Sequence, residues 1–276
     1  MARFIVFGDS HGADLDSIIR ETNSQKPDAV LITGDLRGYT PSGEKFFLDV
    51  LQLARDLSRP AYVIPGSHEH RSEWGKAFGA LGERKDWVID LSNGKTVEVA
   101  GIVLVPYGGA TWTPIPEAQR HEAFLINPLM QVSDLAVGLH RAKGKPTVLM
   151  MHESPRMYGD IARFFVRPSD GARLPAGVTH EQFGQWPLKE EHAGNEQVQD
   201  LIEGNLGNRM PNLTLFGHIH ENHELGPRAQ EVPTRKAVED GAIVKHLTLN
   251  PGPLMRGYYG IVTIGDDGVS HSIRKV

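Results

Sequence analysis

The N-terminal part of the chain alternates between short apolar runs and longer segments with helical periodicity. The apolar runs Phe4–Phe7, Ala29–Thr33 and Ala61–Ile64 predict buried strands. Between them, Ala13–Asn23 and Phe46–Leu57 carry apolar side chains at the spacing of one helix face. Repeated strand–loop–helix units predict a parallel sheet with helices packed on it.

The middle of the chain is less regular. The runs Trp87–Leu91 and Thr96–Val105 flank Asn93-Gly94, a dipeptide that favours tight turns, and we expect them to form a hairpin. The segment Glu117–Lys143 is expected to be mostly helical, with an interruption near Pro128, because proline disrupts a helix interior.

Further apolar runs predict strands in the C-terminal half, and Asn195–Asn205 is expected to form a helix. The expected strands are Thr147–Met151, Leu213–Phe216, Ile243–Leu249, Tyr258–Ile264 and Val269–Ile273. The segment Glu153–Gln185 is rich in Arg, Pro and Gly and is predicted to be irregular. Since no linker divides the chain, we predict a single domain over residues 1–276, with 153–185 as a lid or insertion.

Composition excludes several classes of protein. The 276 residues are 39% hydrophobic and 23% charged, as in folded globular proteins. The chain has no cysteine, which excludes a disulfide framework, a Cys-based zinc site and a thiol nucleophile. A formal net charge of −5 argues against a broad nucleic-acid-binding surface. Without a signal-like or membrane-spanning apolar run, we expect a cytoplasmic protein with no membrane partner.

Side chains able to bind metals follow five of the predicted strands. In chain order they are Asp9 and His11; Asp35; Ser67, His68, Glu69 and His70; His152; and His218 and His220. Carboxyl ends of parallel strands meet at one edge of a sheet, where ligand sites form. We therefore expect these side chains to converge, because five strands would otherwise have to produce the same arrangement by accident.

The types of these side chains indicate which metals they would bind. Asp and His ligands without cysteine suit Mn, Fe or Zn. Two carboxylates and four histidines exceed what one catalytic metal needs, but suit two metals ~3.5–4 Å apart that share a carboxylate. His70 and His223 are expected to support ligands or lie at the surface. The remaining histidines lack the strand-end context and are interpreted as structural.

Five short motifs and a later tripeptide carry a family resemblance. They are Gly8-Asp9-Ser10-His11-Gly12, Gly34-Asp35, Gly66-Ser67-His68-Glu69, His152, Gly217-His218-Ile219-His220 and Asn250-Pro251-Gly252. In this order they resemble the motifs of the calcineurin-like metallophosphoesterases. Each motif alone is weak, but the ordered set spans almost the whole chain and is strongly specific.

The resemblance implies an α/β fold of two packed mixed β-sheets flanked by helices, a four-layer sandwich, with a dinuclear metal centre at the strand ends. It implies one set of ligands for each metal, sharing one residue: Asp9, His11, Asp35 and His220 for the first, and Asp35, Ser67, His152 and His218 for the second. It also implies that His68 binds no metal, contacts the substrate phosphate and protonates the leaving group.

Ser67 departs from the family pattern, which has Asn at this position. Serine is shorter and is a weaker neutral ligand than the carbonyl oxygen of Asn. Either water fills the gap, or the second metal binds weakly, or the chain is a point variant of an active enzyme. We expect unequal sites, with the first metal bound more tightly than the second.

The predicted function is a metal-dependent phosphoesterase that hydrolyses a phosphodiester or phosphomonoester. Two divalent or trivalent ions (Mn, Fe or Zn) would activate a bridging hydroxide for attack on phosphorus. The expected partner is a small phosphorylated substrate such as a nucleotide. One alternative is a nuclease, which the acidic net charge disfavours. The other is a catalytically weakened interaction module that keeps the fold, which only Ser67 favours.

Signals for substrate recognition are weaker. Guanidinium groups near the motifs suit phosphate, although a solvated basic loop explains them equally well. They belong to Arg37, Arg156, Arg163, Arg167 and Arg173. Aromatic loop residues could stack on a base or sugar, but we favour packing of the lid onto the domain. These residues are Tyr107, Trp112, Tyr158 and Phe164.

Overall fold

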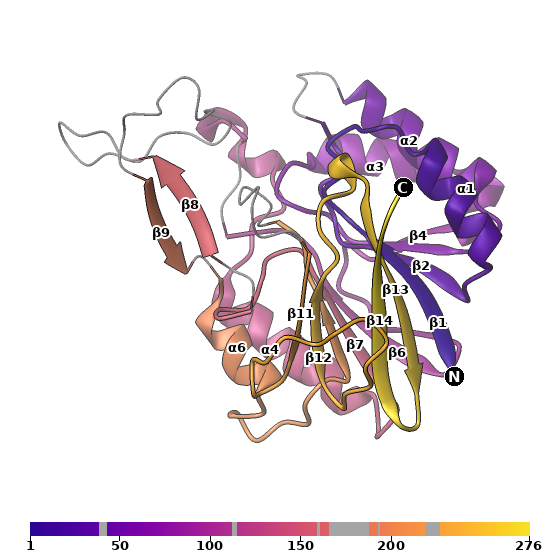
Figure 1. The fold of residues 1–276 in the computed structure, drawn as a ribbon. Coiled ribbons are helices and arrows are strands. Elements are labelled where there is room, and N and C mark those ends of the chain that lie inside the picture. The colour runs from indigo at the N-terminus through magenta and orange to yellow at the C-terminus, as the bar shows by residue number, and fades with distance from the viewer. Residues whose placement is uncertain (39–42, 112–114, 159–160, 166–187, 193, 219–226) are drawn as a thin grey trace.

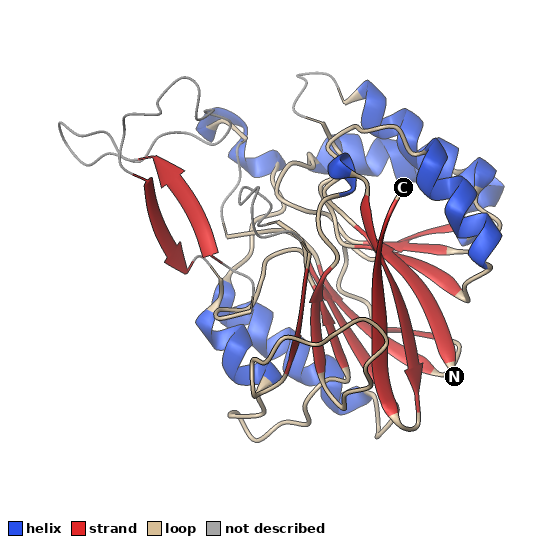
Figure 2. Ribbon diagram, in the orientation of Figure 1, coloured by secondary structure: helices blue, strands red, loops and turns tan. Residues whose placement is uncertain are grey.

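The fold is seen in a computed structural model that describes residues 1–38, 43–111, 115–158, 161–165, 188–192, 194–218 and 227–276. Two six-stranded sheets lie face to face, and helices cover the outer side of each (Figures 1 and 2). This is the predicted four-layer α/β arrangement. His220 and His223 lie outside the described residues.

The first sheet has the strand order β14-β13-β1-β2-β3-β4. Its strands are β1 (Ala2–Phe7), β2 (Ala29–Ile32), β3 (Ala61–Val63), β4 (Val88–Asp90), β13 (Tyr258–Gly265) and β14 (Gly268–Lys275). Strands β1, β2 and β3 are parallel, as predicted, and β4 joins them in parallel. Strands β13 and β14 extend the sheet in antiparallel pairing. Phe7 lies beside Ile32, and Ile32 beside Val63, so three strands deliver their following loops to the same edge.

The second sheet has the order β11-β12-β10-β7-β6-β5. Its strands are β5 (Val97–Val99), β6 (Ile102–Tyr107), β7 (Thr147–Met151), β10 (Leu213–Leu215), β11 (Arg228–Glu231) and β12 (Leu247–Asn250). Strands β6, β7, β10 and β12 are parallel, whereas the outer strands β5 and β11 are antiparallel to their neighbours. Leu215 pairs with Met150, which brings the loops after β7 and β10 together.

Helices α1 (Asp16–Gln25), α2 (Glu44–Asp56) and α3 (Arg71–Gly79) cover the first sheet, and α4 (Pro128–Arg141) and α6 (Glu196–Ile202) cover the second (Figure 1). Short 3₁₀ turns are η1 (Gly82–Asp86), η2 (Glu117–Glu122) and η3 (Leu254–Arg256). Both faces of β1 are buried. Ile5 and Phe7 pack against the helices, and Phe4 and Val6 pack against the second sheet. This double burial explains why the strand is apolar throughout instead of alternating.

The predicted hairpin around Asn93-Gly94 is wrong. Strand β4 pairs with β3 in the first sheet, whereas β5 pairs with β6 in the second. The tight turn between β5 and β6 lies at Ala100 and Gly101, which have φ values of 51° and 80°. Asn93-Gly94 instead lies where the chain passes from one sheet to the other. Local turn preference cannot show which sheet a neighbouring strand joins.

Other elements also differ from the prediction. Helix α3 and strand β11 were not predicted, and only the end of the Ile243–Leu249 run belongs to a strand, β12. The segment Glu153–Gln185 is not irregular throughout, because β8 (Ile161–Phe165) pairs with β9 (Leu188–His192) in a separate two-stranded sheet (Figure 1). The interrupted helix is confirmed as η2 followed by α4, which begins at Pro128.

Helix α6 confirms the prediction of a helix after Asn195. The Asn195 side chain caps it by accepting hydrogen bonds from the backbone N–H groups of Gln197 and Val198. Among the described helices, none is both long and apolar enough to cross a membrane.

Candidate metal centre

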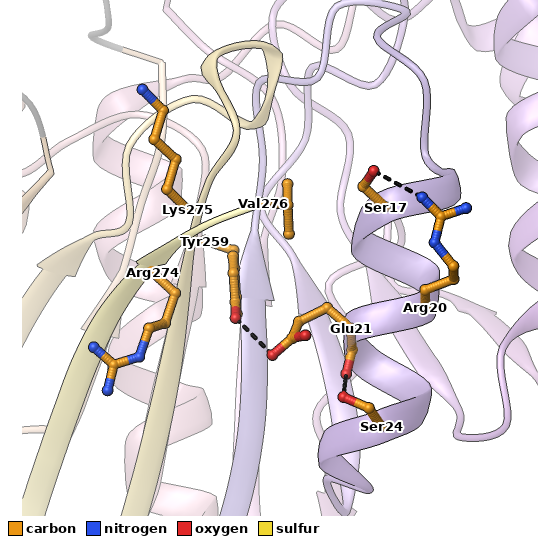
Figure 3. A pocket seen from close by; sticks show the side chains of 8 residues that line it. All are labelled: Ser17, Arg20, Glu21, Ser24, Tyr259, Arg274, Lys275 and Val276. Carbon is orange, nitrogen blue, oxygen red and sulfur yellow. Dashed lines mark hydrogen bonds between the residues drawn. The ribbon is translucent and has the colours of Figure 1, made fainter.

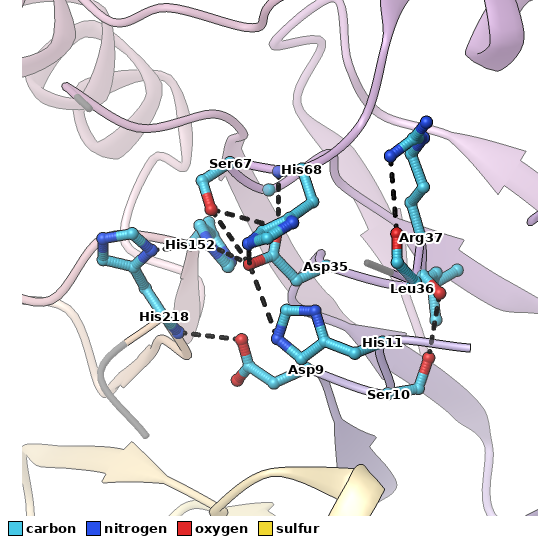
Figure 4. Close-up of polar contacts among 12 residues, drawn as sticks. Asp9, Ser10, His11, Asp35, Leu36, Arg37, Ser67, His68, His152 and His218 are labelled. Carbon is cyan, nitrogen blue, oxygen red and sulfur yellow. Dashed lines mark hydrogen bonds and ion pairs between the residues drawn. The ribbon is translucent and has the colours of Figure 1, made fainter. Parts of the chain in front are cut away.

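The loops after β1, β2, β3, β7 and β10 converge where the corresponding edges of the two sheets meet (Figures 1 and 4). Figure 4 shows Asp35 in the middle of this cluster, with His218 on one side and His11 on the other. Asp9 and His68 also lie in the cluster. The structure therefore brings together the described residues that the strand-end pattern predicted.

Asp35 makes the largest number of polar contacts in Figure 4. Its Oδ2 accepts a hydrogen bond from the Ser67 hydroxyl at 3.0 Å, and its Oδ1 accepts one from the backbone N–H of His68 at 2.9 Å. His152 Nε2 lies 3.2 Å from Asp35 Oδ2, His11 Nε2 lies 3.9 Å from it, and His68 Nε2 lies 4.0 Å from it. One carboxylate thus faces imidazoles from both sheets.

Two groups of metal-capable side chains share Asp35. We call His11, His68 and Asp35 the first group, and Asp35, His152 and His218 the second group; within each, the ligand atoms lie within 4.8 Å of one another. The rings of His11 and His68 pack edge to face with 4.8 Å between their centres, and the rings of His152 and His218 do so with 4.9 Å between their centres. Buried carboxylate and imidazole donors around a shared Asp fit divalent metal ions of the Mn, Fe or Zn type.

Four residues of the centre adopt a backbone conformation that is uncommon outside glycine. Asp9, His11, Asp35 and His218 have φ values of 51°, 46°, 53° and 69°. The surrounding loops hold these conformations: Asp9 donates its N–H to the Gly34 carbonyl at 2.9 Å, and His11 donates to the Asp35 carbonyl at 3.0 Å. The N–H of His218 donates to Asp9 Oδ1 at 3.0 Å. Such strain clusters at functional sites.

The buried Asp35 and His152 side chains stabilise each other's charged forms. Burial alone would raise the pKa of Asp35, but the imidazoles of His152, His68 and His11 hold it well below its usual range. Burial alone would lower the pKa of His152, but the charge and hydrogen bond of Asp35 raise it to about 10. A proton on His152 therefore takes the place that a metal cation would occupy beside Asp35.

The ring of His152 is fixed by a main-chain contact. Its Nδ1 lies 2.8 Å from the carbonyl oxygen of Thr33, so Nδ1 carries the proton and donates it. Nε2 then faces Asp35 and lies 3.1 Å from Nδ1 of His218. A hydrogen bond from the second ring nitrogen orients many metal-binding histidines in this way. Sequence reasoning could not find the Thr33 carbonyl, because main-chain acceptors leave no residue signal.

Glu69 contributes to the centre through hydrogen bonds that the sequence analysis did not predict. Its side chain is fully buried and accepts hydrogen bonds from the backbone N–H groups of Gly66, Arg37 and Asp35. Burial and the neighbouring Asp35 carboxylate raise the pKa of Glu69 to about 7, although the Arg37 and Gly66 N–H groups oppose the rise. The sequence did place Glu69 next to His68 in a motif. That position does not show that the Glu69 side chain is buried between the two loops.

The candidate substrate residues are placed less favourably. The guanidinium of Arg37 bonds to Glu73 at 2.7 Å and points away from Asp35 (Figure 4). Tyr158 is fully buried and donates its hydroxyl hydrogen bond to Glu203, as expected for packing. Arg156 forms an ion pair with Glu196 at 3.5 Å. Tyr107 is half-buried at the end of β6. The other candidates have side chains outside the described part: Arg163, Arg167, Arg173, Trp112 and Phe164.

A separate pocket of about 600 Å³ lies between α1 and the β13–β14 pair (Figure 3). Its cationic side chains have separate partners: Arg20 donates to the Ser17 hydroxyl at 3.1 Å, a guanidinium nitrogen of Arg274 lies 3.6 Å from Asp240 Oδ2, and Lys275 Nζ lies 4.9 Å from the centre of the Tyr258 ring. Figure 3 shows Arg274 and Lys275 pointing in different directions. The pocket therefore lacks the convergent charges of an anion site.

The family model for the calcineurin-like phosphoesterases matches residues 2–222, and the chain belongs to this family. It is thus a member of a family of metal-dependent hydrolases of phosphate esters. This match confirms the resemblance carried by the motifs around Asp9, Asp35 and His152. Comparison with curated protein sequences finds no match.

Solved structures share the fold at low sequence identity. A protein from Thermus thermophilus is 14% identical with a TM-score of 0.64, and the alignment covers 98% of each chain. A dimetal phosphatase from Danio rerio is 11% identical with a TM-score of 0.57, covering 99% of this chain and 96% of that one. A candidate 5′-nucleotidase from Staphylococcus aureus is 12% identical with a TM-score of 0.52, covering 99% of this chain and 54% of that one. These likenesses confirm the predicted fold class.

Proposed function

We propose that the protein is a metal-dependent phosphoesterase that hydrolyses a small phosphodiester or phosphomonoester at two metal ions. The observation that carries the proposal is the position of Asp35. Its carboxylate belongs to both groups and lies between the imidazoles of the first group and those of the second. A shared carboxylate between two sets of donors is the arrangement that two-metal hydrolytic sites need. Family membership supports the same chemistry.

The proposed ligands follow the family pattern. They are Asp9, His11, Asp35 and His220 for one metal, and Asp35, Ser67, His152 and His218 for the other. The geometry supports Asp35 as the shared ligand, and the contact of His152 Nδ1 with the Thr33 carbonyl directs Nε2 toward Asp35 and His218. When bound, the metals supply Lewis acidity toward the phosphoryl oxygens and lower the pKa of a bound water.

His68 is the proposed proton donor to the leaving oxygen. Its backbone N–H is held by Asp35 Oδ1, and its ring rests edge to face on His11. With Nε2 4.0 Å from Asp35 Oδ2, the ring lies next to the proposed metal ligands, within reach of a substrate bound there.

A small phosphorylated substrate, such as a nucleotide, is the proposed partner. The Staphylococcus aureus structure with the same fold is a candidate 5′-nucleotidase, and the Danio rerio one is a dimetal phosphatase. We further propose a single domain over residues 1–276 in which 153–185 is a lid or insertion. Strand β8 lies in this segment and pairs with β9 in a sheet of their own, apart from both large sheets, which supports an insertion (Figure 2).

A combined metal and activity measurement tests the function. Purified protein is stripped with a chelator, reloaded with Mn²⁺, Fe²⁺ or Zn²⁺, and assayed on p-nitrophenyl phosphate and on bis-p-nitrophenyl phosphate. We expect hydrolysis of at least one ester that disappears on stripping and returns on reloading. Two ions bound without hydrolysis of either ester would favour the non-catalytic interaction module.

The nuclease alternative is tested in the same assay with single-stranded and duplex DNA as substrates. We expect little cleavage, because the net charge of −5 gives no general attraction to the phosphate backbone. DNA cleavage faster than hydrolysis of the chromogenic esters would make the nuclease the better assignment.

A further inference from the structure

The loops after β2 and β3 donate hydrogen bonds to one buried carboxylate. Glu69 Oε2 accepts from the backbone N–H of Gly66 at 2.7 Å and from that of Asp35 at 3.3 Å. Its Oε1 accepts from the backbone N–H of Arg37 at 3.1 Å. Glu69 thereby connects the loop that carries Asp35 to the loop that carries Ser67.

These two loops need an acceptor between them. Asp35 and Gly66 both present N–H donors, which cannot bond to each other, and a buried N–H without an acceptor is costly. The loops also lie very close, because a Cβ added at Gly66 would lie 2.2 Å from Asp35 Oδ1. Toward the loop after β1, by contrast, the Asp35 loop is held by direct backbone bonds, such as that from the N–H of His11 to the carbonyl of Asp35.

Asp35 is the residue whose position matters most in the centre. Its φ of 53° is unfavourable for a side chain with a Cβ and persists only where the surroundings hold it. Glu69 accepts from the N–H of Asp35 and from that of Arg37, on both sides of Leu36. The carboxylate of Glu69 therefore acts on the backbone from which the shared ligand projects.

We propose that Glu69 is a positioning residue of the metal centre, which holds the Asp35 loop against the Ser67–His68 loop so that Asp35 faces both ligand groups. This role rests on the proposed function, because that function makes Asp35 the shared ligand. It predicts that a change at Glu69 weakens metal binding although Glu69 itself binds no metal.

Glu69→Gln is the informative variant because glutamine has nearly the same size and shape. An amide has one acceptor oxygen and one NH₂ donor. If the NH₂ replaces Oε2, it faces the Gly66 and Asp35 donors, and if it replaces Oε1, it faces Arg37. Neither orientation satisfies all three N–H groups. We expect about 10–100-fold weaker Mn²⁺ binding, measured by calorimetry without substrate.

Asp49→Asn provides a matched control. Asp49 is another buried carboxylate, but it lies on α2 and bonds to Lys45 outside the centre. We expect it to lower the thermal midpoint of the metal-free protein while leaving Mn²⁺ affinity unchanged. A general effect of removing a buried negative charge would weaken Mn²⁺ binding in both variants and would overturn the proposal.

The remaining outcomes are decisive. Wild-type Mn²⁺ affinity in a folded Glu69→Gln protein would show that the proposal is wrong. If Glu69→Gln does not fold, Glu69→Asp, which keeps the charge but shortens the reach, must show weakened Mn²⁺ binding; if neither variant folds, Glu69 is a folding residue and not a positioning residue. Wild-type protein that binds two Mn²⁺ without hydrolysing any ester would refute the proposed function alone, because the titration contains no substrate.

Discussion

The two ligand groups share Asp35 but differ in how closely their donors are spaced. In the second group, His152 Nε2 lies 3.1 Å from His218 Nδ1 and 3.2 Å from Asp35 Oδ2. In the first group, His11 Nε2 lies 3.9 Å from the same oxygen, and His68 Nε2, which is not among the proposed ligands, lies 4.0 Å from it. Ligand atoms that share one ion at bond lengths of about 2.1 Å are roughly 3.0–3.4 Å apart at right or tetrahedral angles. Both distances from His152 Nε2 in the second group fall in this range.

This difference opposes the expectation from Ser67. The sequence predicts that the metal with Ser67 among its ligands binds more weakly, yet His152 Nε2 lies closer to Asp35 Oδ2 than His11 Nε2 does. The Ser67 hydroxyl is also engaged, because it donates to Asp35 Oδ2. We therefore expect the affinity of the second metal to depend on the positions of His152, His218 and Asp35 as well as on the residue at position 67. The following predictions separate these contributions, from the largest expected effect to the smallest.

Asp35→Asn should abolish hydrolysis and lower the metal content, because it removes the charge that both groups share. The fold should survive, since asparagine keeps an oxygen to accept from the His68 N–H. Metal analysis, an ester assay and a circular dichroism spectrum of one preparation test this. Full activity with unchanged metal stoichiometry would exclude a shared Asp35.

His68→Ala should lower kcat by about 10²–10⁴ while both metals remain bound, as expected for a general acid. The loss should be smaller for esters with good leaving groups, which need little protonation. A series of aryl phosphates of graded leaving-group pKa measures this. An equal loss across the series would argue against the acid role. Loss of metal would show that His68 is a metal ligand.

The pH dependence should have opposite signs in the metal-free and the metal-loaded protein. Asp35 raises the folded-state pKa of His152 to about 10, above its ordinary value of 6.5. The protonated pair therefore stabilises the metal-free protein fully below pH ~6.5, and this stability is lost as pH rises through about 10. Metal must displace the proton, so metal affinity should rise with pH.

Thermal melts at pH 6, 8 and 10, with and without Mn²⁺, measure both trends. The melting temperature should fall with pH in the metal-free protein, while the increase on adding Mn²⁺ should grow. His152→Gln should remove most of the metal-free trend. A metal-free melting temperature that rises over this range would contradict the assigned Asp35–His152 ion pair.

Ser67→Asn should give the smallest change. Asparagine adds a carbonyl oxygen for the second metal and for the phosphate, so metal binding should tighten and turnover should rise, by at most about tenfold. The gain is limited because the neighbouring imidazoles are already closely arranged. Calorimetric titration of both forms tests it. If the Ser67 form already binds two metals with matched affinity, and Asn changes neither binding nor rate, Ser67 is a tolerated variation.

Much of the centre could be predicted because its residues follow strand ends. Asp9, Asp35 and His152 each stand directly after or close to an apolar run, and parallel strands deliver such residues to one edge whatever the rest of the fold. The contacts that orient these side chains could not be predicted. Thr33 acts through a carbonyl and Glu69 through bonds to backbone N–H groups, and neither role leaves a pattern in residue types.

The ligand roles of all the proposed residues, the acid role of His68, the single domain with its lid or insertion and the cytoplasmic location stay predictions. His220 lies outside the described residues. The family and the fold class, by contrast, are confirmed.

The sequence by itself determined the family, the apolar strands and which of the described metal-capable side chains lie together, because burial on both faces of a strand and the motif loops each require particular residue types in order. Only the tertiary structure decided which strands share a sheet. Asn93-Gly94 suggested a hairpin, yet β4 joined the first sheet and β5 the second. Strand pairing depends on contacts between residues distant in the chain, and so does the placement of the Glu69 carboxylate between two loops. Neither can be read from local preferences.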